Sequence, residues 1–348
     1  MKAVVFSYTR KGAKLSLKVG STLTSLGYST ECFTISKFVN ESPILKESAN
    51  FTKSAEAAFS NNEVIVYIGA TGIAIRAVAP YVKNKLYDPA VISIDESGNF
   101  VIPLLSGHIG GANTIAKKIA KAIFATPVVT TATDVNGLIA IDEWAARNDI
   151  YISNMSVAKE FASRIIDGDF VGVKSKFKLE GKLPKGLRDS LDTEVGLVLD
   201  SNEDDKPYRI TLNLIPRIYV LGIGCRRDTP LEKIEALVLT KLKEMKISLK
   251  AVKLICSVDL KANEKGLLAF GEKNNIFEHF YTAQELSNVP GEFTSSKLVQ
   301  RVVGVDNVCE RAAVLGSNNG ELILKKTPLN GVTLAIAKIN KTFDFNKY

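Results

Sequence analysis

Short apolar runs of strand length alternate with amphipathic segments over the first 150 residues, and this alternation constrains the fold most strongly. Residues 3–7 and 64–68 are β-rich runs, and the second of them is closed by Gly69. Between them, residues 13–26 carry apolar side chains at helical spacing and end at Gly27. Such alternation predicts a layered α/β domain with a mostly parallel sheet.

The second half of this region predicts a hairpin followed by a further helix and strand. The apolar runs 91–94 and 100–102 are joined by residues 95–99, Asp-Glu-Ser-Gly-Asn, which is a strong turn signal. Residues 109–123 then have a helical pattern, and residues 127–130 resemble a strand. We therefore expect an N-terminal domain over residues 1–138.

The remainder of the chain predicts two more domains. Residues 139–215 are less regular and indicate a small α+β middle domain, whereas residues 216–348 return to alternation and indicate a separate α/β domain. The elements expected in the middle domain are a helix over 157–166 and strands over 194–199 and 209–214. Those expected in the last domain are strands over 218–223, 252–257, 276–280, 321–324 and 332–336, and helices from Pro230 to about 245, from Ser295 or Ser296 to about 304, and over 308–314.

Charge and composition narrow the class of ligand. The formal net charge is +8, and residues 216–348 hold 20 basic and 14 acidic side chains, which is six of that surplus. A positive surplus favours anionic partners, but a nucleic-acid site needs clustered basic residues, and here they are scattered. We therefore expect no nucleic-acid partner, although a basic nucleic-acid-binding protein remains a third alternative.

Membrane and metal sites are also not expected. The apolar runs are too short to span a bilayer, and residues 1–8 do not resemble a signal peptide, so the sequence predicts a cytoplasmic protein without a membrane partner. The four cysteines contain no C-x-x-C pair and there are only two histidines, which argues against a protein-bound metal.

Three polar, glycine-bearing loops are the candidate functional segments of the N-terminal domain. The first, residues 69–76 (GATGIAIR), follows a strand and opens a helix, where Thr71, Gly72 and Arg76 are suited to bind an anion. It lacks both a complete dinucleotide fingerprint and a P-loop lysine, and a tight strand-to-helix turn explains it equally well.

The second loop, residues 106–113 (SGHIGGAN), places three glycines around His108. An imidazole titrates near neutrality and is a natural general acid or base. A histidine that only hydrogen-bonds its own tight loop is the alternative. Ser106, Gly110 and Asn113 are the expected substrate-binding residues of this segment.

The third loop, residues 130–137 (TTATDVNG), contains Thr131, Thr133, Asp134 and Asn136. Ligands of open α/β sheets bind beyond the carboxyl ends of the strands. Because all three loops follow strands, we expect them to converge on one pocket there. A capping turn is the alternative for the third loop taken alone.

In the last domain, residues 222–229 (GIGCRRDT) end a strand in glycines and place two arginines before a helix. Arg226 and Arg227 are a plausible carboxylate clamp, because guanidinium binds carboxylate bidentately. Cys225 is expected to be a packed thiol rather than a nucleophile. His279 and Trp144 are expected to serve packing.

Taken together, these segments resemble the CbiG family of cobalamin biosynthesis. The resemblance is strongest from GATGIAIRAVAPYV through DPAVISIDESGNFVIPLLSGHIGGAN to PVVTTATDVNG and DEWA, and it returns in LGIGCRRDTP, GVDNVCERAA and VTLAIA. It covers essentially the whole chain. The sequence departs from the pattern at Asp228, where a small residue such as glycine is more usual, and at residues 309–311, where the family is less charged.

The resemblance implies a cobalt-precorrin-5A hydrolase, which opens a δ-lactone of a cobalt-bearing tetrapyrrole and expels acetaldehyde to give cobalt-precorrin-5B. His108 is then the expected general base or acid, and Asp134 is expected to orient it or to activate water. Backbone N–H groups near Gly72 or Gly110 are expected to stabilise the oxyanion, and Arg76, Arg226 and Arg227 to bind carboxylates of the substrate.

The same resemblance implies no protein cofactor, because cobalt arrives with the substrate. Neighbouring enzymes of the pathway are expected as further partners. The main alternative is a non-catalytic carrier of cobalt tetrapyrroles in the same pathway, which shares every binding feature and differs only in turnover.

Overall fold

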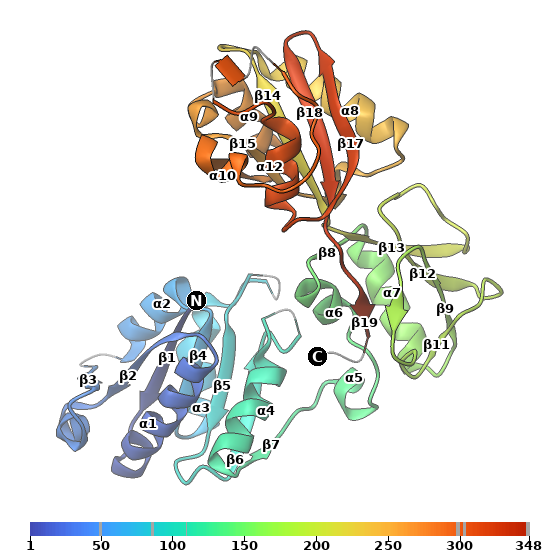
Figure 1. Ribbon diagram of the computed structural model, residues 1–348. Helices are drawn as coiled ribbons and strands as arrows, with labels where there is room; N and C mark the ends of the chain where they lie inside the picture. Colours follow the sequence, from blue (N-terminus) through green and yellow to red (C-terminus); the bar gives the residue numbers. More distant parts are fainter. Residues whose placement is uncertain (49–50, 85–86, 109, 297–299, 302–303, 346–348) are drawn as a thin grey trace. The chain divides into compact units, whose positions relative to one another are not determined.

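The computed structural model describes residues 1–48, 51–84, 87–108, 110–296, 300–301 and 304–345. Contacts within the chain divide it into two compact units, Met1–Glu143 and Trp144–Tyr348 (Figure 1). The second unit contains two separate five-stranded sheets. The division into three domains that the sequence predicts stays a prediction. No helix in the described ranges is both long and apolar enough to span a membrane.

A seven-stranded sheet with the order β3-β2-β1-β4-β5-β6-β7 forms the centre of the first unit. All neighbours pair in parallel except β5 and β6, which form an antiparallel hairpin. The predicted α/β class with a mostly parallel sheet is confirmed. The strands are β1 (Lys2–Ser7), β2 (Ser29–Thr34), β3 (Leu45–Glu47), β4 (Val64–Ile68), β5 (Ala90–Ile94), β6 (Phe100–Leu105) and β7 (Thr126–Pro127).

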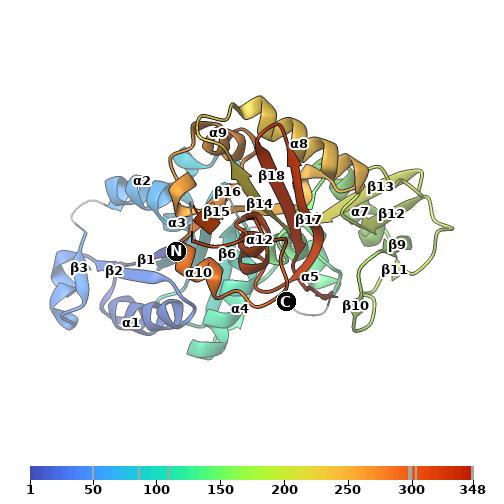
Figure 2. The same ribbon diagram turned by 45° about the horizontal axis from the view of Figure 1, so that its top comes forward.

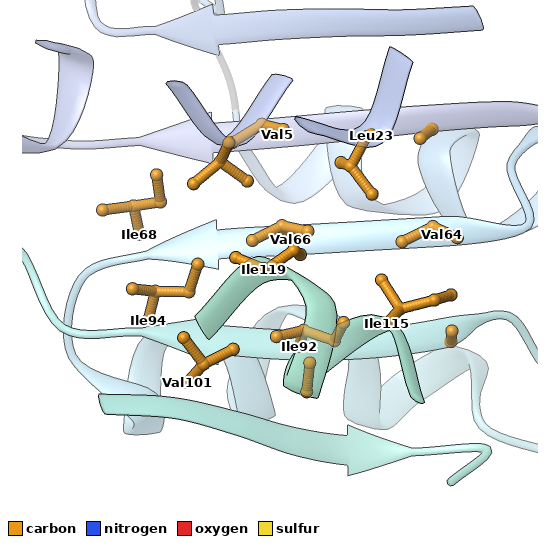
Figure 3. Close-up of a cluster of buried hydrophobic side chains, with 14 of the residues drawn as sticks. Val5, Leu23, Val64, Val66, Ile68, Ile92, Ile94, Val101, Ile115 and Ile119 are labelled. Atoms are coloured by element: carbon orange, nitrogen blue, oxygen red, sulfur yellow. The ribbon is translucent and has the colours of Figure 1, made fainter. Parts of the chain in front are cut away.

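Helices cover both faces of this sheet because successive strand residues point to opposite sides. Val5 of β1 belongs to an apolar cluster that α1 (Arg10–Ser25) and α4 (Ala112–Ile123) cover, as Figure 3 shows. Val4 and Phe6 pack on the other face against α2 (Phe51–Asn61) and α3 (Thr71–Val78). Two short helices, α5 (Ala132–Val135) and α6 (Ile141–Arg147), follow β7.

The direction of β6 corrects one expectation. The loop before α3 follows the carboxyl end of β4, where the Thr71 hydroxyl lies 3.2 Å from that of Ser93 near the end of β5. The loop after β6 lies at the opposite edge, since Ser106 donates to the carbonyl of Asp88, which precedes β5. The two contacts are five residues apart along the strand, about 16 Å. The prediction that all three loops converge on one pocket is therefore wrong for the Thr71 loop.

The middle part of the chain forms a five-stranded sheet with the order β11-β9-β12-β13-β8. Its strands are β8 (Ile150–Ile152), β9 (Val171–Ser175), β11 (Leu187–Arg188), β12 (Val195–Leu199) and β13 (Ile210–Pro216), and α7 (Met155–Ile166) packs against it. The chain returns to this region at its end, where β19 (Phe343–Asp344) lies in dark red beside the green elements of the middle part in Figure 1. There β19 pairs with β10 (Leu179–Glu180).

Trp144 anchors this returning segment. It is fully buried, its ring contacts those of Phe343 and Phe345, and its indole N–H donates to the carbonyl of Asp344 at 2.9 Å. The interpretation of Trp144 as a packing residue is confirmed.

The last part of the chain is built on a sheet with the order β16-β15-β14-β18-β17. Its strands are β14 (Tyr219–Cys225), β15 (Val252–Val258), β16 (Phe277–Tyr281), β17 (Glu321–Leu329) and β18 (Val332–Lys338). Helices α8 (Leu231–Glu244) and α9 (Lys265–Asn274) cover one face, whereas α10 (Ala283–Ser287) and α12 (Cys309–Gly316) pack on the other (Figure 2).

The predicted elements of this domain match the structure closely. Of the helix expected from Ser295 or Ser296, only Gln300 and Arg301 are described as helical, and residues 297–299 and 302–303 lie outside the described residues. The same holds for Ile109, the expected start of the helix that the structure begins at Ala112.

Two backbone constraints shape the start of this domain. A Cβ at Gly222 in β14 would lie 1.8 Å from the carbonyl oxygen of Cys309, because α12 packs directly onto the strand backbone. Asp228 has a φ of 57°, in the left-handed region where glycine is the most favoured residue and aspartate is tolerated. A glycine, the residue expected at this position from the resemblance, would adopt this backbone conformation without strain.

We predict that Gly222→Ala destabilises the second unit by about 3 kcal/mol, because α12 has to move away from the sheet. Urea unfolding followed by the fluorescence of Trp144, the single tryptophan, measures this. Gly72→Ala is the control, since its Cβ would meet only the flexible end of Arg76 at 3.4 Å. Equal unfolding midpoints for both variants and the wild type would contradict the prediction.

Candidate active site

The second and third loops come together at one edge of the N-terminal sheet and form a polar cluster around His108. The Nε2 atom of His108 lies 3.0 Å from the Thr133 hydroxyl and 3.6 Å from Asp134 Oδ2. Its Nδ1 atom lies 3.7 Å from Asp142 Oδ1. The imidazole is therefore placed between two carboxylates, with a hydroxyl in hydrogen-bonding contact. Its side chain is 23% exposed, so a ligand can reach it.

The glycines around His108 permit a very tight loop. Ser106 has a φ of 56°, and a Cβ at Gly110 would lie 2.4 Å from the Cβ of Ser106. The N–H groups of Gly111, Ala112 and Asn113 donate to the carbonyls of residues 108, 106 and 107. These first N–H groups of α4 are consequently satisfied by the loop itself.

Asp134 is the centre of the hydrogen bonds beside His108. Its Oδ2 accepts from the Thr131 hydroxyl at 2.6 Å and from the amide of buried Asn113 at 2.9 Å, and its Oδ1 accepts from Lys117 at 2.5 Å. Partial burial raises the pKa of Asp134, but the hydrogen bonds from Lys117, Thr131 and Asn113 outweigh it and hold the pKa below its ordinary value. Asp134 is therefore a carboxylate at neutral pH.

Two members of the cluster were not predicted. Lys117 lies one helical turn after Asn113 in α4, so its i+4 spacing on the same face was a signal that could have found it. Asp142 is 34 positions from His108 and lies beyond a loop, and no local pattern connects the two residues.

The other predicted residues of this unit lie elsewhere. Asn136 is exposed and donates to the carbonyl of Ala132, so it closes its own turn. Thr71, Gly72 and Arg76 lie at the opposite edge of the sheet, where the guanidinium of exposed Arg76 folds back toward Gly72. Their roles stay predictions.

The C-terminal domain has a cavity of its own, with a volume of about 430 Å³. Among the described residues, three cationic side chains line it, namely Arg226, Lys261 and Lys326. Arg227 instead lies near Glu264. Burial raises the pKa of Glu264, but the hydrogen bonds from Lys261 and from the N–H of Asp228 and the charges of Lys261 and Arg227 outweigh it and lower that pKa. The two arginines of the predicted clamp thus have different surroundings.

The thiols and the carboxylate at this cavity are packed groups. Burial raises the pKa of the Cys225 thiol above its ordinary value, and it raises the pKa of Cys309 to about 11. Both thiols are therefore protonated at neutral pH, as expected for Cys225. Glu310 is fully buried and accepts from the N–H of Thr294, the hydroxyl of Thr294 and the N–H of Lys326. Glu310 therefore connects the segment around Thr294 with strand β17 through hydrogen bonds to its carboxylate.

His279, the second histidine, lies on the exposed face of edge strand β16. Its ring contacts that of Tyr281, with 4.4 Å between the ring centroids. His279 is therefore a surface residue whose ring contacts a neighbouring ring, and it does not belong to the core.

We predict that the first unit loses stability in acid partly through Asp134. A carboxylate whose folded pKa is lowered stabilises the fold above about pH 4, its unfolded pKa, and this contribution is lost as the pH falls through the folded value. Asp134→Asn should therefore show a smaller loss of stability between pH 5 and pH 3. Amide hydrogen exchange of α4 measures it, with exposed Asp192→Asn as the control. An unchanged pH dependence in Asp134→Asn would contradict the prediction.

Comparison with known proteins gives the family. Residues 53–134 match the model described as Cobalamin synthesis G N-terminal, and residues 219–337 match Cobalamin synthesis G C-terminus. A cobalt-precorrin-5A hydrolase of Salmonella typhimurium is 33% identical over 344 residues, which cover 95% of this chain and 96% of that protein.

Two further relatives are similar over most of their length. A cobalt-precorrin-5A hydrolase of Priestia megaterium is 29% identical over 96% of this chain and 94% of its own. A protein of Methanocaldococcus jannaschii described as a probable cobalt-precorrin-5A hydrolase is 29% identical over 80% of this chain and 87% of its own. Both halves of the family pattern and an almost full-length relative agree, and the chain belongs to the cobalamin synthesis G family.

Proposed function

We propose that this protein is a cobalt-precorrin-5A hydrolase, which opens the δ-lactone of its substrate, releases acetaldehyde and yields cobalt-precorrin-5B. The names of two relatives that match nearly the whole chain support the substrate. The observation that carries the chemistry is the placement of His108 between Thr133, Asp134 and Asp142. A partly exposed imidazole in contact with a hydroxyl and close to two carboxylates can act as the general base of a hydrolytic acyl transfer.

His108 is the general base in this proposal. It accepts the proton of the oxygen that attacks the lactone carbonyl, and the lactone C–O bond then breaks to release an alkoxide on the macrocycle. The alkoxide forms the carbonyl group of acetaldehyde as the neighbouring carbon–carbon bond breaks. The bond specificity of the enzyme, a hydrolase that acts on a carbon–carbon bond, rests on this step.

Asp134 serves as a positioning residue in the same proposal. Its low pKa and its three hydrogen-bond donors make it a poor proton acceptor at neutral pH. It holds α4 and the third loop together and keeps a negative charge 3.6 Å from His108 Nε2, which stabilises the imidazolium that forms during the reaction.

The cationic residues supply substrate binding. Carboxylates on the macrocycle pair with guanidinium and ammonium groups, and we assign this role to Arg76 and to the cavity that Arg226, Lys261 and Lys326 line. We propose that the cobalt enters with the substrate; the expected cytoplasmic location stays a prediction.

We predict catalytic release of acetaldehyde when the purified protein is incubated anaerobically with cobalt-precorrin-5A. The measurement is an acetaldehyde assay together with the mass of the macrocycle over time. One acetaldehyde should form per macrocycle converted, over many turnovers per protein. Tight binding of the macrocycle without acetaldehyde would instead favour the carrier function, and neither binding nor release would contradict the assigned substrate.

We predict that His108→Ala lowers kcat by roughly 10²–10⁴-fold while the substrate still binds, because the proton acceptor is lost but the cationic residues remain. His279→Ala is the matched control, since this histidine is exposed on β16 and should leave turnover unchanged. Turnover of His108→Ala within threefold of the wild type would remove His108 from the mechanism.

A further inference from the structure

The contact between Thr133 and His108 has the geometry of an activated nucleophile. The hydroxyl oxygen of Thr133 lies 3.0 Å from Nε2, within the range in which an imidazole removes the proton of a neighbouring alcohol. The neighbouring Thr131 differs, because its hydroxyl proton is donated to Asp134 at 2.6 Å. Of the two hydroxyls, that of Thr133 is therefore the one that faces the base.

Asp142 occupies the position of the third group in such an arrangement. Its Oδ1 lies 3.7 Å from Nδ1, the ring nitrogen on the far side from Thr133, and its side chain is only 17% exposed. A carboxylate there favours the tautomer that carries its proton on Nδ1 and leaves Nε2 free to accept the hydroxyl proton. Separations of this kind are commonly longer without substrate than in the reacting complex.

Asp134 does not fit that role. It lies on the same side of the ring as Thr133, and its two oxygens already accept from Lys117, Thr131 and Asn113. The Oδ1 atom of Asp142 accepts from the N–H of Glu143 and is also the carboxylate oxygen that lies 3.7 Å from Nδ1. The two carboxylates therefore have different contacts. Asp134 connects α4 with the third loop, whereas Asp142 lies beside Nδ1.

We propose that Thr133, His108 and Asp142 form a catalytic triad in which Thr133 attacks the lactone and becomes covalently acylated. This proposal rests on the proposed function and replaces water with Thr133 as the first nucleophile. It adds a catalytic residue, Thr133, and a positioning residue, Asp142, to the assignment of His108.

The covalent step balances as follows. The Thr133 oxygen forms a bond to the lactone carbonyl carbon, and its proton moves to His108 Nε2. The lactone C–O bond breaks, and the alkoxide so released expels acetaldehyde while its carbon–carbon electron pair remains on the macrocycle. The macrocycle carbon that keeps this electron pair takes up the proton from His108 Nε2, which frees the imidazole. His108 then removes a proton from water, the water oxygen bonds to the ester carbonyl carbon, and the bond to the Thr133 oxygen breaks as that oxygen takes the proton back from His108.

A covalent intermediate has a physical advantage for this reaction. The acyl bond keeps the macrocycle covalently attached to the protein, so the carbon–carbon bond breaks before the macrocycle can dissociate. Acetaldehyde is then expected to leave before the macrocycle does.

The test is a rapid acid quench of the full-length wild-type protein during turnover with cobalt-precorrin-5A, followed by intact-protein mass measurement and peptide mapping. The quench series is taken at low temperature with enzyme in excess. We expect a protein species heavier by one macrocycle, with or without the acetaldehyde unit, and the added mass should map to Thr133.

Variants separate a nucleophile from a residue that only positions His108. Thr133→Val should lose at least about 10²-fold in kcat and form no adduct, whereas Thr133→Ser should form the adduct on the new serine. Asp142→Asn should retain adduct formation but slow it by about 10-fold or more, since it can no longer select the tautomer. Thr126→Val, on exposed strand β7 of the same unit, should behave as the wild type.

Each outcome decides the proposal. Turnover by Thr133→Val within tenfold of the wild type overturns the proposal. Wild-type acetaldehyde release without an adduct at any quench time also overturns it. In that case water is the nucleophile, and the proposed hydrolase function still holds. Absence of acetaldehyde from the wild type overturns the proposed function itself, and this proposal with it.

Discussion

The antiparallel pairing of β5 with β6 is the constraint on which the candidate site depends. All other neighbouring strands of the N-terminal sheet pair in parallel. The reversal at β6 sends the His108 loop to the opposite edge. There it meets the third loop and the start of α6, which bring Asp134 and Asp142 to the same imidazole.

Charge is used differently in the two units. In the first, both carboxylates near His108, those of Asp134 and Asp142, accept hydrogen bonds from neighbouring groups. In the second, buried Glu310 holds the segments around a small cavity lined by Arg226, Lys261 and Lys326, of which Lys261 is paired with Glu264 at 2.8 Å.

Much of this was predictable from the sequence, and the parts that were not have physical reasons. Strands such as 64–68 and helices such as 155–166 were predicted closely because apolar period and turn residues are local signals. The predicted hairpin at residues 95–99 already implied that the Thr71 and His108 loops lie at opposite edges, but the expectation of a common pocket ignored strand direction. Asp142 was missed because tertiary structure alone brings it to His108. At Asp228 the unusual residue was noticed, but only the backbone φ explained it.

The chain contains only two histidines, one in each unit, and this allows a direct test of where the substrate binds. The measurement is the imidazole NMR signals of histidine-labelled protein during titration with cobalt-precorrin-5A, with assignment by replacing His279. The account predicts that the His108 signal shifts or broadens on binding while that of His279 stays unchanged. An unchanged His108 signal at saturation would place the substrate away from the His108 cluster and contradict the account.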